Sequence, residues 1–199
     1  MGSTAFVFPG QGSQSVGMLA ELAGVFPVVK ETFAEASEVL SLDLWKLTQE
    51  GPEAQLNQTL YTQPAMLAAG VAIYRIWMEE GGGVPDFMAG HSLGEYTALV
   101  CAQSLDFTSA VGLVSDRARF MQEAVPEGTG GMVAVLGMND EDVVRLCNEQ
   151  RGQDVLEPAN FNSPGQLVVS GHMVAVQRLA QAAGDAGDVG PVADIVTRR

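Results

Sequence analysis

Hydrophobic residues in the first part of the chain form short continuous runs, separated by longer segments in which they recur at helical spacing. The runs at residues 5–8 and 86–89 are each followed closely by glycine, which is typical of buried strands that lead into tight loops. Helical spacing predicts a helix within residues 26–40, an apolar helix over residues 64–78 opened by its proline, and a further helix capped by Asp106. Strands separated by long helices favour an α/β fold with a largely parallel sheet.

The composition of the chain changes at residues 126–131, which read Pro-Glu-Gly-Thr-Gly-Gly, a segment typical of a loop. Beyond this break the pattern predicts, in order, a strand, a helix, two strands and a helix, over residues 132–136, 140–150, 156–161, 166–170 and 173–183. That order is a ferredoxin-like unit without its last strand, for which residues 192–196 are the one candidate in an atypical tail at 184–199. We therefore expect a large subdomain over residues 1–125 and a small ferredoxin-like subdomain over residues 126–199.

Composition limits the classes of function. The chain has 199 residues, of which 47% are hydrophobic, and this is enough for a real core. Its 24 acidic residues against 10 basic ones give a formal net charge of −14, which argues against binding to nucleic acid. The longest apolar stretch is too short to span a membrane, and Cys101 and Cys147 have no metal-binding spacing. We expect a monomeric cytoplasmic protein with reduced, buried cysteines and no metal.

The segment from Gly90 to Gly94 reads Gly-His-Ser-Leu-Gly, which matches the nucleophile elbow, a sharp turn between a strand and a helix. A serine at its centre, here Ser92, projects its hydroxyl out of the sheet, and the N–H of Leu93 faces a developing oxyanion from the helix N-terminus. The same five residues would also suit a structural turn. The strand before them and the apolar helix after them favour the nucleophile.

A second glycine-rich loop follows the first strand, where residues 8–14 read Phe-Pro-Gly-Gln-Gly-Ser-Gln. By itself this loop is typical of a tight turn with a helix cap. Together with the elbow, it becomes a candidate for the second oxyanion donor, through the backbone N–H of Gln11.

Four segments resemble, in order and spacing, motifs of the malonyl-CoA:acyl carrier protein transacylase family of bacterial fatty acid synthesis. They are Gly-Gln-Gly-Ser-Gln at 10–14, Gly-His-Ser-Leu-Gly-Glu at 90–95, Asp-Arg-Ala-Arg-Phe-Met at 116–121 and Asn-Phe-Asn-Ser-Pro-Gly-Gln at 160–166. The resemblance covers about residues 4–183. It implies an α/β-hydrolase-like acyltransferase core with a ferredoxin-like small subdomain.

The resemblance also implies a role for each matched residue. Ser92 would take the malonyl group from malonyl-CoA, a coenzyme A thioester, and pass it to the phosphopantetheine thiol of acyl carrier protein, with no bound cofactor. The backbone N–H groups of Gln11 and Leu93 would hold the oxyanion, and Arg117 would bind the free malonyl carboxylate bidentately. Without the motif, Arg117 would be interpreted as a surface arginine on an amphipathic helix.

Other polar residues receive weaker interpretations. His91, Gln63, Asn160 and Asn162 are candidates for lining the pocket, although polar residues are common in such turns. His172, in the small subdomain, is expected to start the last helix.

The chain departs from the family in one respect. The resemblance places the family's general base on a histidine just after the small subdomain, and residues 184–199 contain no histidine. We therefore expect an incomplete, C-terminally truncated core with exposed apolar surface at the sheet, and catalysis impaired by loss of the base. The alternatives are a truncated relative without enzymatic activity and a serine esterase or thioesterase built on the same elbow.

Overall fold

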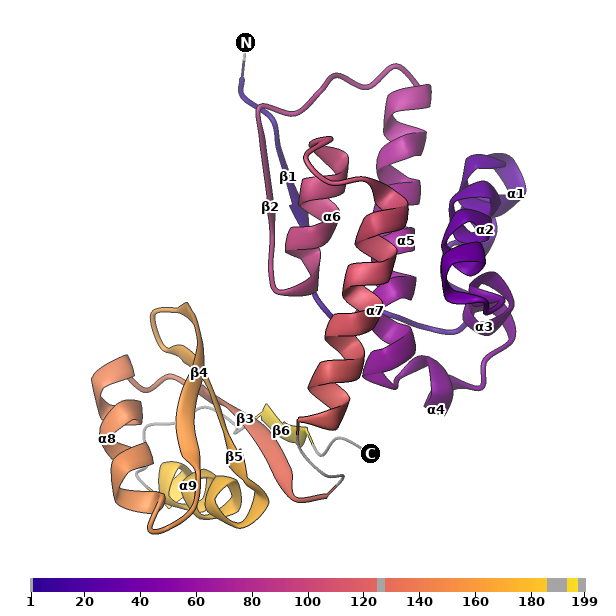
Figure 1. Ribbon diagram of the computed structural model, residues 1–199. Coiled ribbons are helices and arrows are strands. Elements are labelled where there is room, and N and C mark those ends of the chain that lie inside the picture. The colour runs from indigo at the N-terminus through magenta and orange to yellow at the C-terminus, as the bar shows by residue number, and fades with distance from the viewer. Residues whose placement is uncertain (1, 125–127, 186–192, 197–199) are drawn as a thin grey trace. The chain divides into compact units, whose positions relative to one another are not determined.

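The computed structural model describes residues 2–124, 128–185 and 193–196, and the chain divides into two compact units, Met1–Ala124 and Val125–Arg199 (Figure 1). Each unit has a hydrophobic core of its own and is described by itself. Both units combine helices with a sheet, which confirms the expected α/β class.

The sheet of the first unit consists of β1 (Ala5–Phe8) and β2 (Phe87–Gly90), which pair in parallel with Phe8 opposite Gly90. The chain between them forms α1 (Ala20–Val25), α2 (Val28–Leu40), α3 (Leu44–Glu50), α4 (Glu53–Leu56) and α5 (Thr59–Glu79). After β2 come α6 (Leu93–Cys101) and α7 (Phe107–Glu123). The predicted cap of α7 is confirmed, because Asp106 accepts a hydrogen bond from the backbone N–H of Ser109.

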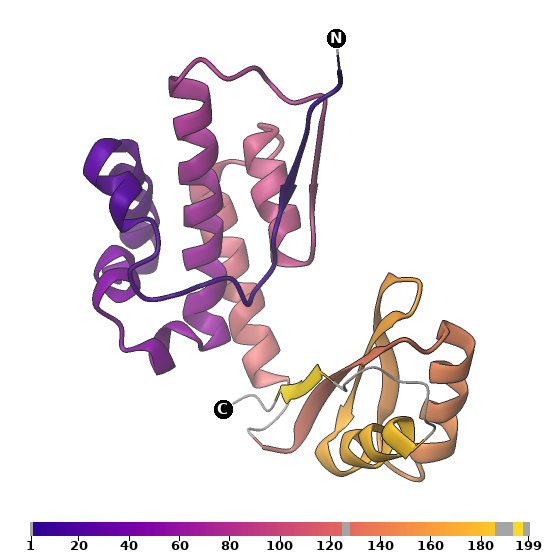
Figure 2. The ribbon, with the colours of Figure 1, turned by 180° about the vertical axis from the view of Figure 1, so that it is seen from behind.

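Helix α5 is the central element of this unit. It packs on α2 on one side and on α6 and α7 on the other, and α6 packs in turn on both strands (Figure 1, Figure 2). The largest fully buried side chains include Phe33 from α2, Leu67 from α5 and Leu93 from α6. Leu93, the first residue of α6 and the residue after Ser92, is therefore anchored in the core.

The start of α5 differs from the expectation. The helix begins at Thr59, so Pro64 lies inside it instead of opening it. A proline inside a helix removes a hydrogen bond and costs about 3 kcal/mol. Every residue from Thr62 to Ala69 is buried, and this burial against the neighbouring helices outweighs the local cost.

The second unit is formed by β3 (Gly130–Leu136), α8 (Asp140–Gln150), β4 (Leu156–Ser163), β5 (Gln166–His172), α9 (Met173–Asp185) and β6 (Ala193–Val196). The strands form an antiparallel sheet in the order β4-β5-β3-β6. This is the strand order of a ferredoxin-like fold. The candidate last strand is confirmed, because β6 pairs with β3 at the edge of the sheet.

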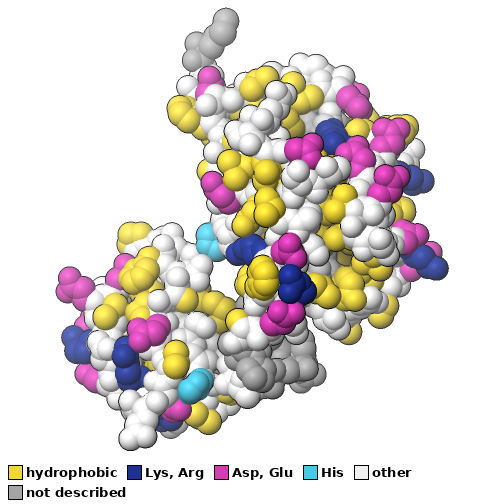
Figure 3. All heavy atoms as spheres, in the orientation of Figure 1, with side chains coloured by type: hydrophobic (Ala, Val, Ile, Leu, Met, Phe, Trp, Pro, Cys, Tyr) yellow, Lys and Arg dark blue, Asp and Glu magenta, His cyan; other side chains and the backbone are white. Residues whose placement is uncertain are grey.

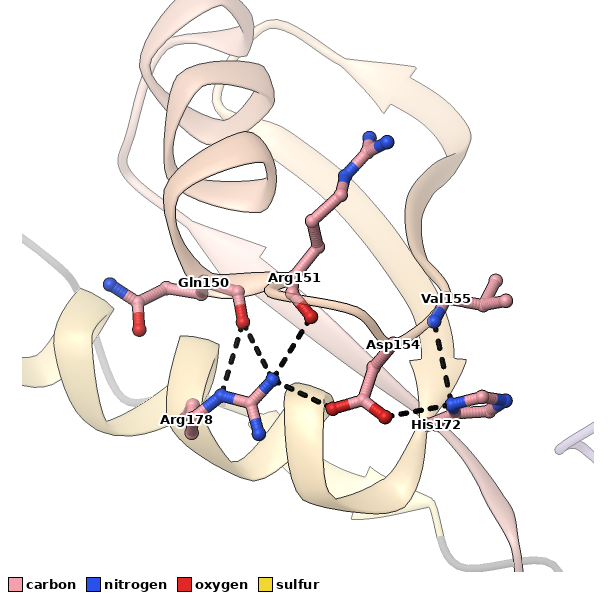
Figure 4. Close-up of polar contacts among 6 residues, drawn as sticks. All are labelled: Gln150, Arg151, Asp154, Val155, His172 and Arg178. Carbon is pink, nitrogen blue, oxygen red and sulfur yellow. Dashed lines mark hydrogen bonds and ion pairs between the residues drawn. The ribbon is translucent and has the colours of Figure 1, made fainter.

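A polar network joins the helices of the second unit to the ends of β4 and β5 (Figure 4). Arg178 on α9 donates to the carbonyl oxygens of Gln150 and Arg151 at the end of α8, and to Asp154 Oδ2 at 2.9 Å. The other oxygen of Asp154 lies 3.1 Å from Nδ1 of His172. The expectation that His172 starts the last helix is wrong: it ends β5, where strand pairing holds its backbone, and α9 begins one residue later.

Both cysteines are buried thiols, as the sequence predicts. Burial raises the pKa of Cys101 to about 12 and the pKa of Cys147 to about 11. At neutral pH neither sulfur is a thiolate, so neither is an activated nucleophile.

Acidic side chains are scattered over the surface, and exposed apolar side chains lie on the sheet of the first unit (Figure 3). Acidic side chains, magenta in Figure 3, are spread over both units on the face shown. On the two strands, Val7 is 77% and Phe87 is 66% exposed. Across the described ranges, no helix combines the length and the apolar character needed to cross a membrane.

Candidate active site

Ser92 lies at the sharp turn between β2 and α6, where the sequence predicts an elbow. Its backbone has φ 54° and ψ −109°, a positive φ that is unfavourable for a residue with a side chain. The turn is held by backbone hydrogen bonds from His91 N to Phe8 O at 3.2 Å and from Gly94 N to His91 O at 2.9 Å. Strain of this kind is kept where the surrounding structure enforces it, and here it presents the serine side chain at the surface.

Two glycines make this turn possible. A Cβ atom on Gly90 would lie 1.9 Å from the carbonyl carbon of Gly94, and one on Gly94 would lie 2.1 Å from the carbonyl oxygen of Phe8. Both obstacles are backbone atoms, which cannot rotate away as a side chain can. The close approach of α6 to β2 therefore requires glycine at position 90, and its close approach to β1 requires glycine at position 94.

The side chain of Ser92 is linked through Arg117 to a second helix. Arg117 on α7 donates from Nη2 to Ser92 Oγ at 2.9 Å and from Nη1 to Oε1 of Gln63 on α5 at 2.6 Å. The guanidinium carbon also lies 5.9 Å from the centre of the Tyr96 ring, within the range of a cation–π contact. The structure thus brings together three of the predicted site residues, Ser92, Arg117 and Gln63.

The partners of Arg117 distinguish it from the other arginines. Within the described residues, Arg117 is bound by a hydroxyl, an amide and an aromatic ring and forms no ion pair. The other described arginines each pair with carboxylates: Arg75 with Glu35, Arg119 with Asp116 and Glu123, Arg145 with Asp142 and Glu149, Arg151 with Glu157, and Arg178 with Asp154. Among the described arginines, Arg117 is therefore the one whose charge no carboxylate compensates.

One of the two predicted oxyanion donors, Leu93, lies within the elbow, and the other, Gln11, lies in the loop after β1. Leu93 is the first residue of α6, so its N–H belongs to the helix N-terminus, where backbone donors have no acceptor within the helix. Gln11 lies in the loop after β1, and its side chain donates to Thr59 Oγ1 at 3.2 Å. A Cβ atom on Gly10 would lie 3.0 Å from the carbonyl oxygen of His91, so this loop runs directly against the elbow.

The remaining candidates divide between the two units. His91 is exposed in the elbow beside Ser92. Asn160 and Asn162 lie on β4, which belongs to the second unit. Their assignment to the pocket stays a prediction, as do the catalytic roles of the other candidates.

Sequence reasoning missed two neighbours of the cluster. Met121 Sδ accepts a hydrogen bond from Gln63 Nε2 at 3.3 Å, and Tyr96 packs near the guanidinium of Arg117. Helical spacing carries a signal for both, since Met121 follows Arg117 by four residues and Tyr96 follows Ser92 by four. In the part of the chain that the structure describes, no group of three or more His, Cys, Asp or Glu side chains could hold a metal ion.

Comparisons with known proteins find acyltransferases. The sequence profile of the acyl transferase domain matches residues 5–195. The malonyl CoA-acyl carrier protein transacylases of Salmonella typhimurium and Escherichia coli K12 are 59% and 58% identical over 183 residues, which are 92% of this chain. The chain spans 59% of the length of each of these relatives.

The similar solved structures are also malonyl transacylases. A malonyl-transacylase in complex with its type II polyketide synthase acyl-carrier protein aligns with a TM-score of 0.91 and 55% identity, over 96% of this chain and 62% of that one. The malonyl CoA-acyl carrier protein transacylase of Coxiella burnetii aligns with a TM-score of 0.91 and 51% identity, over 97% of this chain and 60% of that one.

Proposed function

Because this chain belongs to the acyl transferase domain family, we propose that it transfers a malonyl group from malonyl-CoA to the phosphopantetheine thiol of acyl carrier protein, for fatty acid biosynthesis. The observation that carries this proposal is the hydrogen bond of 2.9 Å between Arg117 Nη2 and Ser92 Oγ. It combines a nucleophile with a cation whose other partners are neutral, which suits an acyl group that carries a carboxylate.

The reaction has two half-steps at Ser92. In the first, Ser92 Oγ attacks the thioester carbonyl of malonyl-CoA, the new C–O bond forms, the C–S bond breaks, and coenzyme A leaves with the serine proton as its thiol. In the second, the phosphopantetheine thiol attacks the ester, its proton returns to the serine, and the malonyl thioester leaves on the carrier. Exposure of Ser92 at the elbow suits two bulky partners that arrive in turn.

Each half-step passes through an oxyanion, for which the backbone N–H groups of Leu93 and Gln11 are the proposed donors. The helix N-terminus supports the assignment of Leu93, and the contact of the Gly10 loop with the elbow supports that of Gln11. Loss of one such donor typically slows a reaction on the order of 10²–10³-fold.

Arg117 is the proposed selector of the acyl group. A guanidinium can hold a carboxylate through two parallel hydrogen bonds, each worth about 1.5–3 kcal/mol. An acetyl group has no carboxylate and would leave this charge without its partner. The elbow alone would equally suit a serine esterase or thioesterase, and Arg117 is the feature that favours a malonyl group.

The proposed acceptor follows from the relatives. One of the similar solved structures is described as a malonyl-transacylase together with an acyl-carrier protein, and this supports a carrier-bound thiol as the acceptor. Transfer to this thiol, and not to water, separates the proposal from a thioesterase.

Intact mass spectrometry of the chain after incubation with malonyl-CoA tests the proposal. We expect a malonyl adduct on the wild-type chain and none on Ser92→Ala. Addition of phosphopantetheinylated carrier protein should move the adduct to the carrier. A folded wild-type chain without an adduct would support the inactive relative, and release of free malonate at the same rate with and without carrier would support a thioesterase.

A further inference from the structure

We infer that Gln63 is a positioning residue that holds the guanidinium of Arg117 in place without neutralising it, and so sets the preference of the site for carboxylate-bearing acyl groups. The inference rests on the proposed function and extends it to a residue that does not touch the reacting atoms. Three observations lead to it: the burial of Gln63, the orientation of its amide, and the neutrality of that amide.

Gln63 is fully buried, with 0% of its surface exposed, near the start of the buried stretch of α5. Burial of an amide is unfavourable unless its polar atoms find partners. Both of its groups find them on α7, because Oε1 accepts from Arg117 Nη1 at 2.6 Å and Nε2 donates to Met121 Sδ at 3.3 Å. The amide therefore bridges α5 to two residues one turn apart on α7.

The two contacts also fix which way the amide faces. A thioether sulfur accepts hydrogen bonds and donates none, so the NH₂ group must face Met121 and the oxygen must face Arg117. A guanidinium only donates, which makes the same orientation favourable at the other end. The oxygen of Gln63 is thus held at the one place where it anchors Nη1.

The anchor leaves the guanidinium able to take a second partner. Nη1 carries another proton, and Nη2 donates to Ser92 Oγ at 2.9 Å, so N–H groups remain on the side of the nucleophile. A carboxylate that binds there meets a guanidinium already held in one orientation, and less rotational freedom is lost on binding.

The neutrality of the amide matters as much as its position. Arg75, on the same helix as Gln63, is held by the carboxylate of Glu35 through contacts of 2.7 and 3.0 Å, and its charge is compensated inside the protein. A glutamate at position 63 would position Arg117 in a similar way but would compensate its charge. Glutamine is the side chain of this size that positions the guanidinium and leaves its charge to the substrate.

Two variants separate position from charge, and a third is the control. Gln63→Met keeps the length of the side chain but removes the acceptor, and Gln63→Glu keeps an acceptor but adds a charge. Thr62→Val is the matched control, because Thr62 is the adjacent buried residue and its hydroxyl donates to the carbonyl oxygens of Leu56 and Gln58, not to α7.

The first readout is the NMR signal of the Arg117 Nε–H group, identified by its loss in Arg117→Lys. Rotation about the Nε–Cζ bond is slow when the guanidinium is anchored and fast when it is free. We expect slow rotation in the wild-type chain, in Gln63→Glu and in Thr62→Val, and fast rotation in Gln63→Met. Equal rotation in the wild-type chain and Gln63→Met would overturn the inference.

The second readout is the affinity of the chain for malonate. It is measured by titration of the same NMR signal, with acetate as the reference anion. The added cost of ordering the freed guanidinium predicts that Gln63→Met weakens malonate binding about twofold to tenfold. We expect a loss at least as large in Gln63→Glu, although its guanidinium stays anchored. An equal loss in Thr62→Val would overturn the inference, because it would show general loosening of α5.

Loading of Ser92 by malonyl-CoA is followed in the same samples. It distinguishes a failure of the proposed malonyl transfer from a failure of the positioning role of Gln63. If the wild-type chain loads malonyl and the Gln63 variants match it in all readouts, the inference fails alone. If the wild-type chain does not load malonyl but Gln63→Met frees the guanidinium and weakens malonate binding, the proposed transfer fails and the positioning role stands.

Discussion

The guanidinium of Arg117 lies against the hydroxyl of Ser92, with 2.9 Å between Nη2 and Oγ, although the two residues are 25 positions apart in the chain. A carboxylate that binds to this guanidinium therefore enters the space next to the nucleophile. An acyl group whose carboxylate is one methylene from its carbonyl carbon is short enough to reach both residues. This relationship underlies the proposed malonyl specificity.

Substitution of Arg117 by alanine should separate malonyl from acetyl loading. Two charge-assisted hydrogen bonds to the carboxylate would be lost, so the rate of Ser92 loading by malonyl-CoA should fall on the order of 10²–10⁴-fold. Loading by acetyl-CoA should change far less, because acetyl makes neither bond. Rates of adduct formation by intact mass measure both.

Arg119→Ala is the matched control for that experiment. Arg119 lies two residues away on α7 and is exposed, and its charge is already paired with Asp116 and Glu123. Its loss should change either rate by less than about fivefold. Equal effects of Arg117→Ala on malonyl and acetyl loading would refute the carboxylate role.

Gly94→Ala should destabilise the first unit strongly. The new methyl group would lie 2.1 Å from the carbonyl oxygen of Phe8, and α6 would have to move away from β1. We expect a loss of about 3 kcal/mol or more in the free energy of unfolding. Urea unfolding followed by tryptophan fluorescence reports this unit alone, because Trp45 and Trp77 are the only tryptophans of the chain.

Gly112→Ala tests whether that loss comes from the collision. Gly112 lies within α7, and a Cβ atom there meets no other atom within 4 Å. Alanine is the better helix former, so this variant should gain up to about 1 kcal/mol. Similar losses in both variants would contradict the packing argument for Gly94.

Ser92→Gly should stabilise the chain while it abolishes acylation. The serine is held at φ 54° and ψ −109°, which glycine adopts with little strain. We expect a gain of about 1 kcal/mol in the free energy of unfolding and no malonyl adduct. Ser92→Ala should also lose the adduct but without the gain, since alanine keeps the Cβ atom; equal stability of the two variants would show that the elbow is not strained.

Acid should weaken the second unit through Asp154. The hydrogen bonds from Arg178 and then from His172 lower the pKa of this carboxyl below its usual value (Figure 4). A group with a lowered pKa in the folded state contributes stability that is complete above its unfolded pKa of about 3.9 and is lost as pH falls through the folded pKa. Amide hydrogen exchange in β5 should therefore accelerate as pH falls below about 4, after correction for the intrinsic rates.

The variant Asp154→Asn tests the assignment of this pH dependence. It removes the titrating carboxyl, so exchange in β5 should be faster than in the wild type at neutral pH and should respond less to acid. Glu157→Gln is the control, because Glu157 is exposed on the neighbouring strand and pairs with Arg151. An unchanged acid response in Asp154→Asn would assign the effect to another group.

Local chemistry made several features predictable from the sequence. Asp106 caps α7 because its carboxyl reaches the N–H of Ser109 within a single turn. The elbow at Ser92 follows from the glycines around it, whose missing side chains allow α6 to approach both strands. The last strand, β6, is identified by a short apolar run in a polar tail. Each of these signals acts over a few residues.

The sequence by itself therefore determined the α/β class, the turn that presents Ser92 and most element positions, because these depend on neighbours along the chain. Only the tertiary structure decided that α5 begins before Pro64, since the burial that outweighs the proline comes from other helices. It likewise decided that Gln63 meets Arg117, 54 residues further on, and that Arg117 meets Ser92. A hydrogen bond depends on distances of about 3 Å in space, and no local pattern encodes such a distance between residues on different helices.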